Sequence, residues 1–286
     1  SRMVMYLIQW QAFNHEELPI LCRCLSKFIV KHIYIFLCLC ILFGSSWNAF
    51  AFDEGDLKNL KATKQCRKCD LAEAKLTDAD LTNADLFLAN LTVADLRGAN
   101  LSGANLSAAN LYKANLTGAN LTDANLIGAK LHRANLSGAN LSGADLTAAN
   151  LRTVNLARAI LTDAILVRVK FSAADLIWAN LTKANLRWAN LTKANLRWAN
   201  LRKANLYGAN LTGANLTDTL LFQSNLSAAN LTGADLTGAD LTWAELIGAN
   251  LTKANLTGAI LTDANLIRAI FCDTTMQDGT MDNSGC

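Results

Sequence analysis

The 286-residue chain has few of the residues on which most enzymes and metal sites depend. It contains three histidines, of which only His132 lies beyond residue 32, and a single Cys-x-x-Cys, formed by Cys66 and Cys69. Zinc needs four ligands grouped in space, so a zinc site is not expected. The glycines stand singly, which excludes a phosphate-cradling loop. We therefore predict that the chain is not an enzyme and binds no metal or cofactor.

The chain also lacks a large excess of charge of either sign. The formal net charge is +3, and residues 69–271 carry seventeen Lys and Arg against fifteen Asp and Glu. A body so close to neutrality argues against a polyanionic partner, so no nucleic acid is expected. The one proline, Pro19, lies outside this body, which fits a backbone that is paired throughout.

What the chain has instead is a five-residue period. Every fifth residue from Leu71 to Leu266 is leucine, apart from Phe171, and Phe271 follows at the same interval. Alanine usually stands two residues earlier and Asn or Asp one residue earlier, so the unit reads A(N/D)LXX. A helix would spread these leucines around its axis, and a flat strand would alternate them between faces. The pattern therefore predicts a bend in each unit and a solenoid with Leu and Ala inside.

The A(N/D)LXX run resembles the pentapeptide repeat family over about 200 residues. The resemblance implies an all-β fold, a right-handed quadrilateral β-helix in which four units form one coil and residues twenty apart stack. On this basis residues 69–271 form about ten coils. Departures from the unit coincide around residues 158–171, where the resemblance implies a local bend or bulge.

The first 51 residues are expected to form a leader. Lys27 and Lys31 precede an unbroken apolar run from Ile33 to Phe43, and an Ala-Phe-Ala sequence ends at Ala51. These features are typical of a secretory signal peptide. The apolar stretch reaches twenty residues if extended to residue 52, so an uncleaved membrane anchor over residues 33–52 is the alternative. Either outcome predicts an exported body, in the periplasm or the thylakoid lumen.

The two ends of the repeat are expected to be covered. Residues 52–68 predict a short capping helix and linker, with Leu57, Leu60 and Ala62 on one face and Asp53 or Asp56 as its N-cap. Residues 272–286 abandon the period and predict a C-terminal cap.

Four cysteines at these ends are candidates for disulfides: Cys66 with Cys69, and Cys272 with Cys286. The first pair has other interpretations, namely a redox pair, half a metal site or two buried thiols. Neither a second Cys-x-x-Cys nor a thioredoxin-like pattern accompanies it, so a structural role is favoured.

A candidate partner surface lies where residues 181–190 and 191–200 repeat the same ten letters, LTKANLRWAN. No acidic residue occurs between Leu176 and Leu216. Twenty-residue stacking places Trp178 over Trp198 and Trp188 on the opposite side. Such a band suits binding through stacking and charge, whereas recent duplication of a tolerated unit would also explain it. Its residues are Trp178, Lys183, Arg187, Trp188, Lys193, Arg197, Trp198, Arg202 and Lys203.

A candidate self-association strip follows from the same stacking, which aligns apolar residues in one column. An apolar column on an exposed face is a candidate surface for a homodimer, although β-propensity alone would also fill it. Its residues are Phe87, Ile127, Val167, Tyr207, Ile247 and Ile267.

These observations favour a non-enzymatic structural or interaction protein that presents side-chain columns to a protein partner. A nucleic-acid mimic that inhibits a DNA-binding enzyme is a weaker alternative, because family members of that kind are strongly acidic. A redox protein using Cys66 and Cys69 is the third. Membrane contact is expected only through the N-terminal segment, if it is not cleaved.

Overall fold

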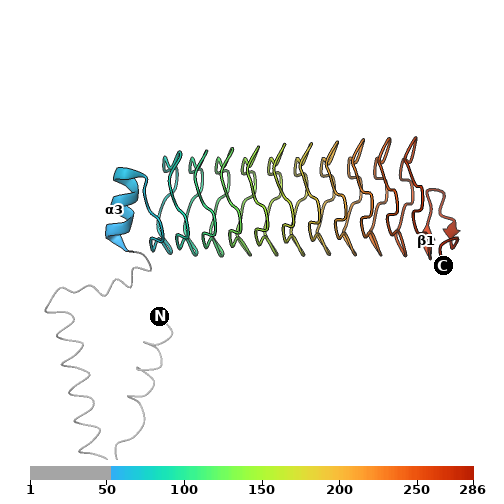
Figure 1. Cartoon of the computed structure of the whole chain (residues 1–286), viewed down its shortest axis with the longest axis horizontal. Coiled ribbons are helices and arrows are strands. Elements are labelled where there is room, and N and C mark those ends of the chain that lie inside the picture. Colours follow the sequence, from blue (N-terminus) through green and yellow to red (C-terminus); the bar gives the residue numbers. More distant parts are fainter. Residues whose placement is uncertain (1–52) are drawn as a thin grey trace, which may run out of the picture. The chain divides into compact units, whose positions relative to one another are not determined.

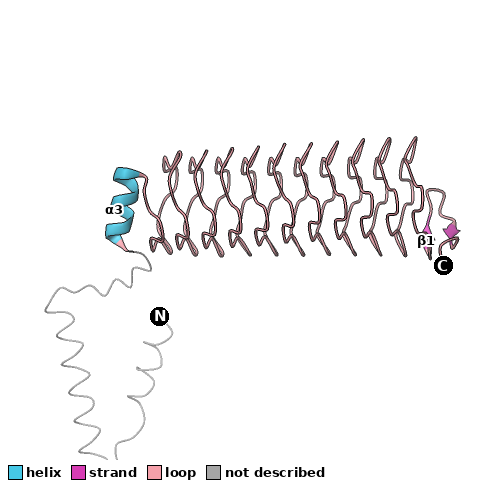
Figure 2. Cartoon of the chain, in the orientation of Figure 1, coloured by secondary structure: helices cyan, strands magenta, loops and turns pink. Residues whose placement is uncertain are grey.

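The structure is a computed structural model that describes residues 53–286, and the predicted leader lies outside these residues. Helix α3 (Glu54–Thr63) precedes a stack of coils, which ends with strands β1 (Thr274–Thr275) and β2 (Met281–Asp282) (Figure 1). The coils themselves consist of turns and single-residue bridges (Figure 2). None of the helical structure within residues 53–286 is long and apolar enough to cross a bilayer.

The predicted twenty-residue stacking is confirmed. Parallel bridges join each residue before a central Leu to its counterpart twenty positions later, from Gln65–Asp85 to Asn255–Thr275. The N–H of Leu101 donates to the carbonyl of Asn120 in the following coil at 2.7 Å. In each unit the central and corner residues donate to the following coil and the residue before the centre donates to the preceding one. This continuous backbone pairing holds the coils in register.

Each corner of a coil is a tight turn with one left-handed residue. The N–H of the small residue closes the turn on the preceding central carbonyl, as from Ala104 to Leu101 at 3.0 Å. The second residue after the centre has positive φ in every unit, for example 65° at Gly103 and 58° at Trp178. Glycine is frequent there because it adopts this conformation without steric cost. The glycines that the sequence shows as scattered surface residues thus mark the corners.

The Asn or Asp before each Leu completes the hydrogen bonding of the unit. The Oδ1 atom of Asn100 accepts the N–H of Ser102 at 3.2 Å and its hydroxyl at 2.9 Å. The amide of Asn120 donates to Asn100 Oδ1 at 3.1 Å, which links successive coils. This geometry explains both the Asn/Asp position and the Ser/Thr that so often follows the Leu, because the Asn or Asp side chain accepts a hydrogen bond from the Ser or Thr hydroxyl.

The bend or bulge expected around residues 158–171 is absent from the structure. Ile160, Ile165 and Lys170 keep their parallel bridges in both directions, so the coil remains regular. What these residues lack is the side-chain acceptor, and the N–H of Thr162 consequently has no partner among the described residues. The prediction was wrong because backbone pairing, which does not depend on the side chain, maintains the coil.

The core is a column of Leu and Ala along the axis. Leucines at the central positions and alanines two residues before them are almost fully buried from Leu71 to Leu256. Phe171 fills one central position at 0% exposure, and Val169 beside it is equally buried. Three polar residues also point inward, and each satisfies its hydroxyl on a carbonyl: Thr219 on Leu196 at 2.9 Å, Ser224 on Leu221 at 2.6 Å and Thr274 on Leu251 at 2.8 Å.

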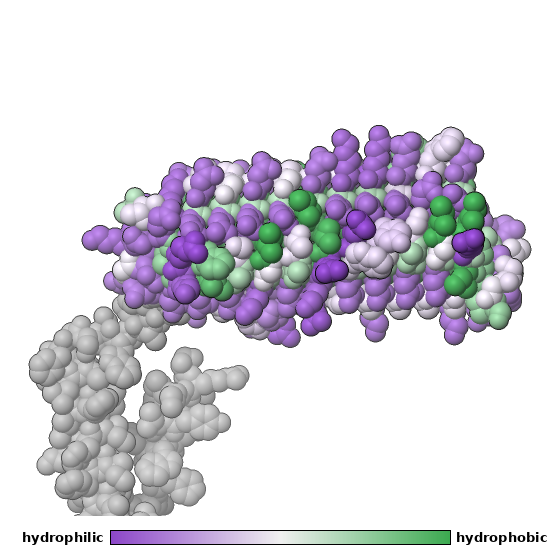
Figure 3. Space-filling model, in the orientation of Figure 1, coloured by the Kyte–Doolittle hydropathy of each residue, from purple (hydrophilic) through white to green (hydrophobic). Residues whose placement is uncertain are grey.

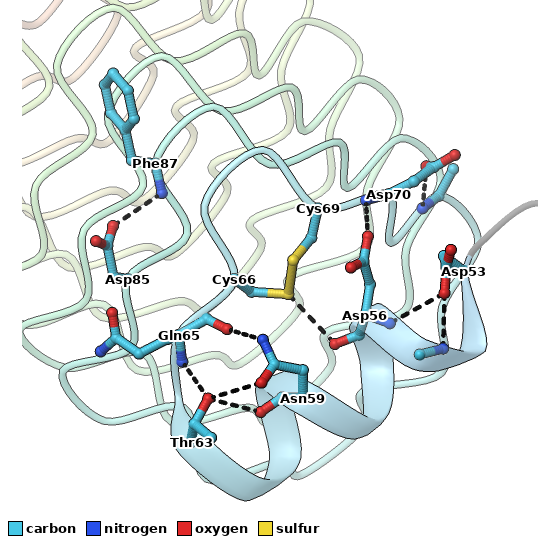
Figure 4. The surroundings of a disulfide bond; sticks show 12 residues. Asp53, Asp56, Asn59, Thr63, Gln65, Cys66, Cys69, Asp70, Asp85 and Phe87 are labelled. Atoms are coloured by element: carbon cyan, nitrogen blue, oxygen red, sulfur yellow. Dashed lines mark hydrogen bonds between the residues drawn. A yellow bond between two sulfur atoms is a disulfide. The ribbon is translucent and has the colours of Figure 1, made fainter.

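Helix α3 supplies the N-terminal coil with the partners that a preceding coil would provide. Asp53 is the N-cap, since its side chain accepts the N–H groups of Gly55 and Asp56. The backbone N–H of Asp53 donates to the carbonyl of Asp70 at 2.9 Å, and the carboxylate of Asp56 accepts the N–H of Asp70 at 2.8 Å (Figure 4). Leu60 is fully buried in the core. This arrangement covers one side of the open backbone edge of the first coil.

Two details of this end differ from the expectation. Ala62 is exposed, so the buried face of the helix consists of Leu60 with the partly buried Leu57. Cys66 occupies a central position, with 1% exposure, and begins the solenoid one unit before the first Leu. Its disulfide with Cys69 lies in the core, and its sulfur is 3.3 Å from the carbonyl oxygen of Asp56 (Figure 4).

The C-terminal end also continues one unit beyond the expected boundary at Phe271. The N–H of Leu256 donates to the carbonyl of Thr275 at 2.8 Å, and Met276 packs partly buried against the core. Strands β1 and β2 then pair antiparallel, and a disulfide joins Cys272 to Cys286.

Residues 53–286 contain everything that this fold uses. Residues 53–286 belong to one compact unit, which contains the core, helix α3 and both disulfides. This part of the chain is therefore expected to fold on its own.

Ile160 and Asn180 occupy the same column in neighbouring coils and form a matched pair for testing the role of the acceptor. Replacing Ile160, which is 41% exposed, by Asn gives the N–H of Thr162 an acceptor and should raise the free energy of unfolding by about 1 kcal/mol. The reverse change, Asn180→Ile, removes the acceptor of the Thr182 N–H and hydroxyl and should lower it by about 1–2 kcal/mol. Thermal unfolding midpoints should move in opposite directions; a lower midpoint for Ile160→Asn would contradict this role.

Candidate partner-binding surface

The four sides of the solenoid are defined by their central residues. Face A contains the centre at residue 71 and every twentieth residue after it, and faces B, C and D begin in the same way at 76, 81 and 86. The residue after each centre lies on the face, and the next residue lies at the left-handed corner. Faces A and C are opposite each other, as are faces B and D.

The predicted stacking of Trp178 on Trp198 is confirmed on face B. Their ring centroids are 4.9 Å apart, and the ring planes differ by 18°. The guanidinium of Arg197 lies 3.8 Å from the ring centroid of Trp198. The Nε atom of Arg197 is buried without a partner in the described chain, so this cation is held against the indole.

Trp188 lies at a corner of face D, opposite the other two tryptophans. Its ring meets Tyr207 of the next coil edge-on, with centroids 5.3 Å apart. A Cβ atom on Gly208 would come within 2.3 Å of the Trp188 ring, so the indole lies over the space that this glycine leaves. Arg187 lies 5.7 Å from the Tyr207 ring. The sequence assigned Tyr207 to the self-association strip, where stacking at twenty residues pairs it with Arg187. Its contact with Trp188, nineteen positions earlier, is a diagonal one that this rule does not predict.

We call the nine predicted residues the aromatic basic belt, and the structure distributes them over all four faces. Lys183, Arg202 and Lys203 lie on face C, and Lys193 lies on face A. The described chain has three ion pairs within 4.0 Å, namely Lys64–Asp80, Arg67–Asp85 and Arg97–Asp95. All three involve the N-terminal coils, so the belt cations have no carboxylate partner among residues 53–286. The belt therefore presents positive charge beside exposed indoles, with Trp178 54% and Trp188 49% exposed.

Two of these ion pairs, those of Asp80 and Asp95, lower the pKa of the carboxylate through the hydrogen bond from the cation. Hydrogen bonding from Arg97, outweighing the opposing effect of burial, lowers the pKa of Asp95 to about 2. Carboxylates this acidic stay charged under ordinary conditions. Titration of Asp95 is consequently not expected to change the surface charge near neutral pH.

The candidate self-association strip lies on face D, in the column that follows the central residues. Its six residues do not adjoin one another throughout, because polar residues alternate with them. The intervening residues are Ser107, Thr147, Arg187 and Ser227. Figure 3 shows apolar side chains in separate groups along the solenoid, with hydrophilic side chains between them. Apart from Ile247 and Ile267, which are adjacent, the strip offers contacts two coils apart, roughly 9.6 Å.

The described residues assemble no site for redox or metal chemistry. Cys66 and Cys69 are 1% and 6% exposed, so their disulfide is out of reach of a partner thiol. No three His, Cys, Asp or Glu side chains in this part of the chain are grouped to hold a metal ion. His132 stacks on Tyr112 with centroids 4.3 Å apart.

Comparison with known proteins identifies the repeat. The sequence model for pentapeptide repeats matches eight copies, in segments that run from residue 65 to residue 284. The chain belongs to the pentapeptide repeat family. Members of this family fold as right-handed quadrilateral β-helices, and the four-sided stack agrees with that form.

Solved pentapeptide repeat proteins resemble this family member to different extents. HetL, involved in heterocyst differentiation regulation in the cyanobacterium Nostoc sp. strain PCC 7120, is 36% identical, over 79% of this chain and 97% of HetL, with a TM-score of 0.47. QnrB1, a plasmid-mediated fluoroquinolone resistance protein, is 22% identical, over 58% of this chain and 84% of QnrB1, with a TM-score of 0.53. No curated protein matches the chain. The likeness to QnrB1 concerns the fold alone.

The stacked tryptophans should have a spectroscopic signature. Two nearly parallel indoles 4.9 Å apart couple electronically, so the far-ultraviolet circular dichroism spectrum should contain an exciton couplet. Either Trp178→Gly or Trp198→Gly should remove it, and Trp188→Gly, which leaves the pair intact, should retain it. Glycine suits these corners because all three tryptophans have φ near 60°. A couplet that survives in the Trp198→Gly variant would show that the rings do not stack.

Proposed function

We propose that the protein is a non-enzymatic, exported scaffold whose aromatic basic belt binds an acidic protein partner. The observation that carries the proposal is the combination of exposed indoles with Lys and Arg side chains that have no carboxylate partner in residues 53–286. Aromatic and Arg side chains are the usual anchors of protein interfaces, and the charge selects a negatively charged partner. The rigid solenoid holds these groups at fixed spacing, which limits the entropy lost on binding.

The export part of the proposal rests on the N-terminal sequence. The charged and apolar segments between Lys27 and Phe43 and the Ala-Phe-Ala site support secretion to the periplasm or thylakoid lumen. Formation of both disulfides requires an oxidising compartment, which supports the same conclusion. N-terminal sequencing of the mature chain tests cleavage after Ala51.

The alternatives have less support. A mimic of nucleic acid needs a strongly negative surface, whereas residues 69–271 carry slightly more basic than acidic residues. A redox role needs an accessible thiol pair, whereas the Cys66–Cys69 disulfide is buried. The scaffold is the function that the surface supports best.

The belt should be necessary for capture of the partner. Replacing Trp178, Trp188 and Trp198 by Gly removes the indole anchors and should weaken partner binding by about tenfold or more, because each anchor typically contributes more than 1 kcal/mol. The immobilised protein would capture partners from an envelope extract of the producing organism, with quantification by mass spectrometry. Trp243→Gly is the matched control, since Trp243 is 55% exposed at a corner outside the belt. A partner lost equally from the control, or retained by the triple variant, would refute the role of the belt.

A homodimer through the self-association strip is a further part of the proposal. Ile267, 63% exposed, adjoins Ile247 on face D, and this pair is the most continuous apolar section of the strip. Sedimentation of residues 53–286 at increasing concentration should show a dimer, and Ile247→Thr with Ile267→Thr should raise its dissociation constant about tenfold. The control pair, Val93→Thr with Ile260→Thr, removes exposed apolar side chains from other faces. A parent chain that remains monomeric would exclude the strip as an interface.

A further inference from the structure

The charges of the solenoid are sorted by face, although the body as a whole is almost neutral. Of the fifteen Asp and Glu in residues 69–271, face A carries Asp70 and Glu73, both in its first coil, and the other thirteen lie on faces B, C and D. Face A is therefore free of carboxylates from Asn90 to Phe271. No other face has a comparable stretch, because each of them carries Asp or Glu in both halves of the solenoid.

Face A also carries more basic residues than any other face in this interval. All of them are exposed, and none lies within 4.0 Å of a carboxylate in the described part of the chain. They are Lys113, Lys130, Arg133, Arg152, Lys170, Lys193 and Lys253. The first six occupy five successive coils, a length of roughly 20 Å at the spacing of paired strands. We call these six cations, together with the neighbouring Tyr112 and His132, the basic face.

Individual contacts reflect the positive potential of this face. Arg133 Nη1 donates to the hydroxyl of Tyr112 at 3.5 Å, and Lys113 lies 5.2 Å from its ring. Burial raises the pKa of Tyr112, but hydrogen bonding and charge from Arg133 and Lys113 outweigh it and lower the pKa below its usual value. The phenol thus responds to cations on both sides of it, with no nearby carboxylate to offset them.

Two of the cations replace a residue that the repeat uses for hydrogen bonding. Lys130 and Lys170 stand where Asn or Asp otherwise accepts a backbone N–H. The N–H groups of His132 and Ser172 consequently have no acceptor within residues 53–286. The face therefore carries its charge at the expense of local hydrogen bonding, which points to a use for the charge itself.

The form of the face indicates what it would bind. One side of a four-sided coil is planar, and the central column of the basic face, between its corners, carries Tyr112, His132 and Arg152 with no large aliphatic side chain. Protein interfaces usually have a cluster of apolar side chains at their centre, whereas the aromatic rings of this face, Tyr112 and His132, stack on each other and no aliphatic side chain accompanies them. A planar, negatively charged and laterally extended partner suits it better. The apolar run from Ile33 to Phe43, outside the described residues, would bring the chain to a membrane as a signal or an anchor.

We propose that face A docks the solenoid flat on an anionic lipid surface, through contact of the basic face with headgroup phosphates. Clustered Lys and Arg are the usual determinant of such binding, and screening by salt weakens it. The attachment is peripheral because the basic face has no aliphatic side chains to insert. It leaves face C, which carries Lys183, Arg202 and Lys203 of the belt, directed away from the membrane.

Variants that restore the repeat test this proposal without disturbing the fold. The face variant combines Lys130→Asn, Arg152→Thr and Lys170→Asn, all residues that other units have at these positions. The control variant combines Arg158→Gly, Arg168→Gly and Arg268→Gly, which remove the same charge from exposed corners of faces B and D and leave every belt residue in place. Residues 53–286 of the parent and both variants would be sedimented with vesicles of phosphatidylglycerol mixed with phosphatidylcholine, and of phosphatidylcholine alone.

The parent should bind the anionic vesicles, and this binding should disappear at high salt and with phosphatidylcholine alone. The face variant should lose about tenfold or more in partition coefficient, and the control variant should keep most of the parent value. Equal loss in both variants would mean that net charge, rather than face A, is responsible, and the proposal fails. It also fails if the parent ignores the vesicles, including the case in which it binds soluble polyglutamate instead, since the partner would then be an acidic polypeptide. Because all nine belt residues are intact in all three proteins, these outcomes are independent of the belt.

Discussion

Hydrogen bonding between consecutive coils is the constraint on which the rest of this protein depends. It requires a unit of fixed length, a small residue where the chain approaches the axis and a left-handed residue at each corner. It also uses an Asn or Asp side chain to satisfy the one N–H that neither the turn nor a neighbouring coil satisfies. The small, Asn/Asp and central positions of each unit are thereby largely committed to the fold. Surface variation is concentrated in the two positions that follow the centre, so binding properties are carried mainly by columns of these residues.

The sequence predicts the parts of the structure that follow from the period. A leucine every fifth residue requires a bent unit, and the twenty-residue repeat correctly placed Trp178 on Trp198. The left-handed corners were not predicted, because Trp, Lys, Asp and Gly share that position and suggest no common conformation. Cys66 was missed as a central residue because neither Cys nor the Gln before it fits the A(N/D)LXX unit.

Other features could not be read from the sequence because they arise only after folding. The exchange of hydrogen bonds between Asp53, Asp56 and Asp70 depends on where helix α3 lies against the first coil. The seating of Trp188 over Gly208 depends on the space left by a missing Cβ atom in the next coil. Counting charges along the chain shows near neutrality, and the segregation of carboxylates away from face A becomes visible only when the residues are sorted by side.

The belt and face A illustrate two ways in which one scaffold can distribute charge. The belt encircles the solenoid over few coils, because its duplicated segment is ten residues long and its copies fall on opposite sides. The cations of face A recur at intervals related to twenty and therefore stay on one side over many coils. Lys193 belongs to both sets and marks where they cross.

The five-residue unit has a consequence for how such chains can diverge. Removing one whole unit from the middle of the solenoid preserves the core and the coil-to-coil pairing, yet it rotates the order of faces for every residue downstream by a quarter turn. Surfaces on either side of the deletion would then point in perpendicular directions, whereas the loss of four consecutive units would shorten the solenoid and leave its faces aligned. The fold therefore tolerates insertions and deletions in multiples of five residues. Only multiples of twenty conserve the geometry that a partner spanning the deletion would recognise.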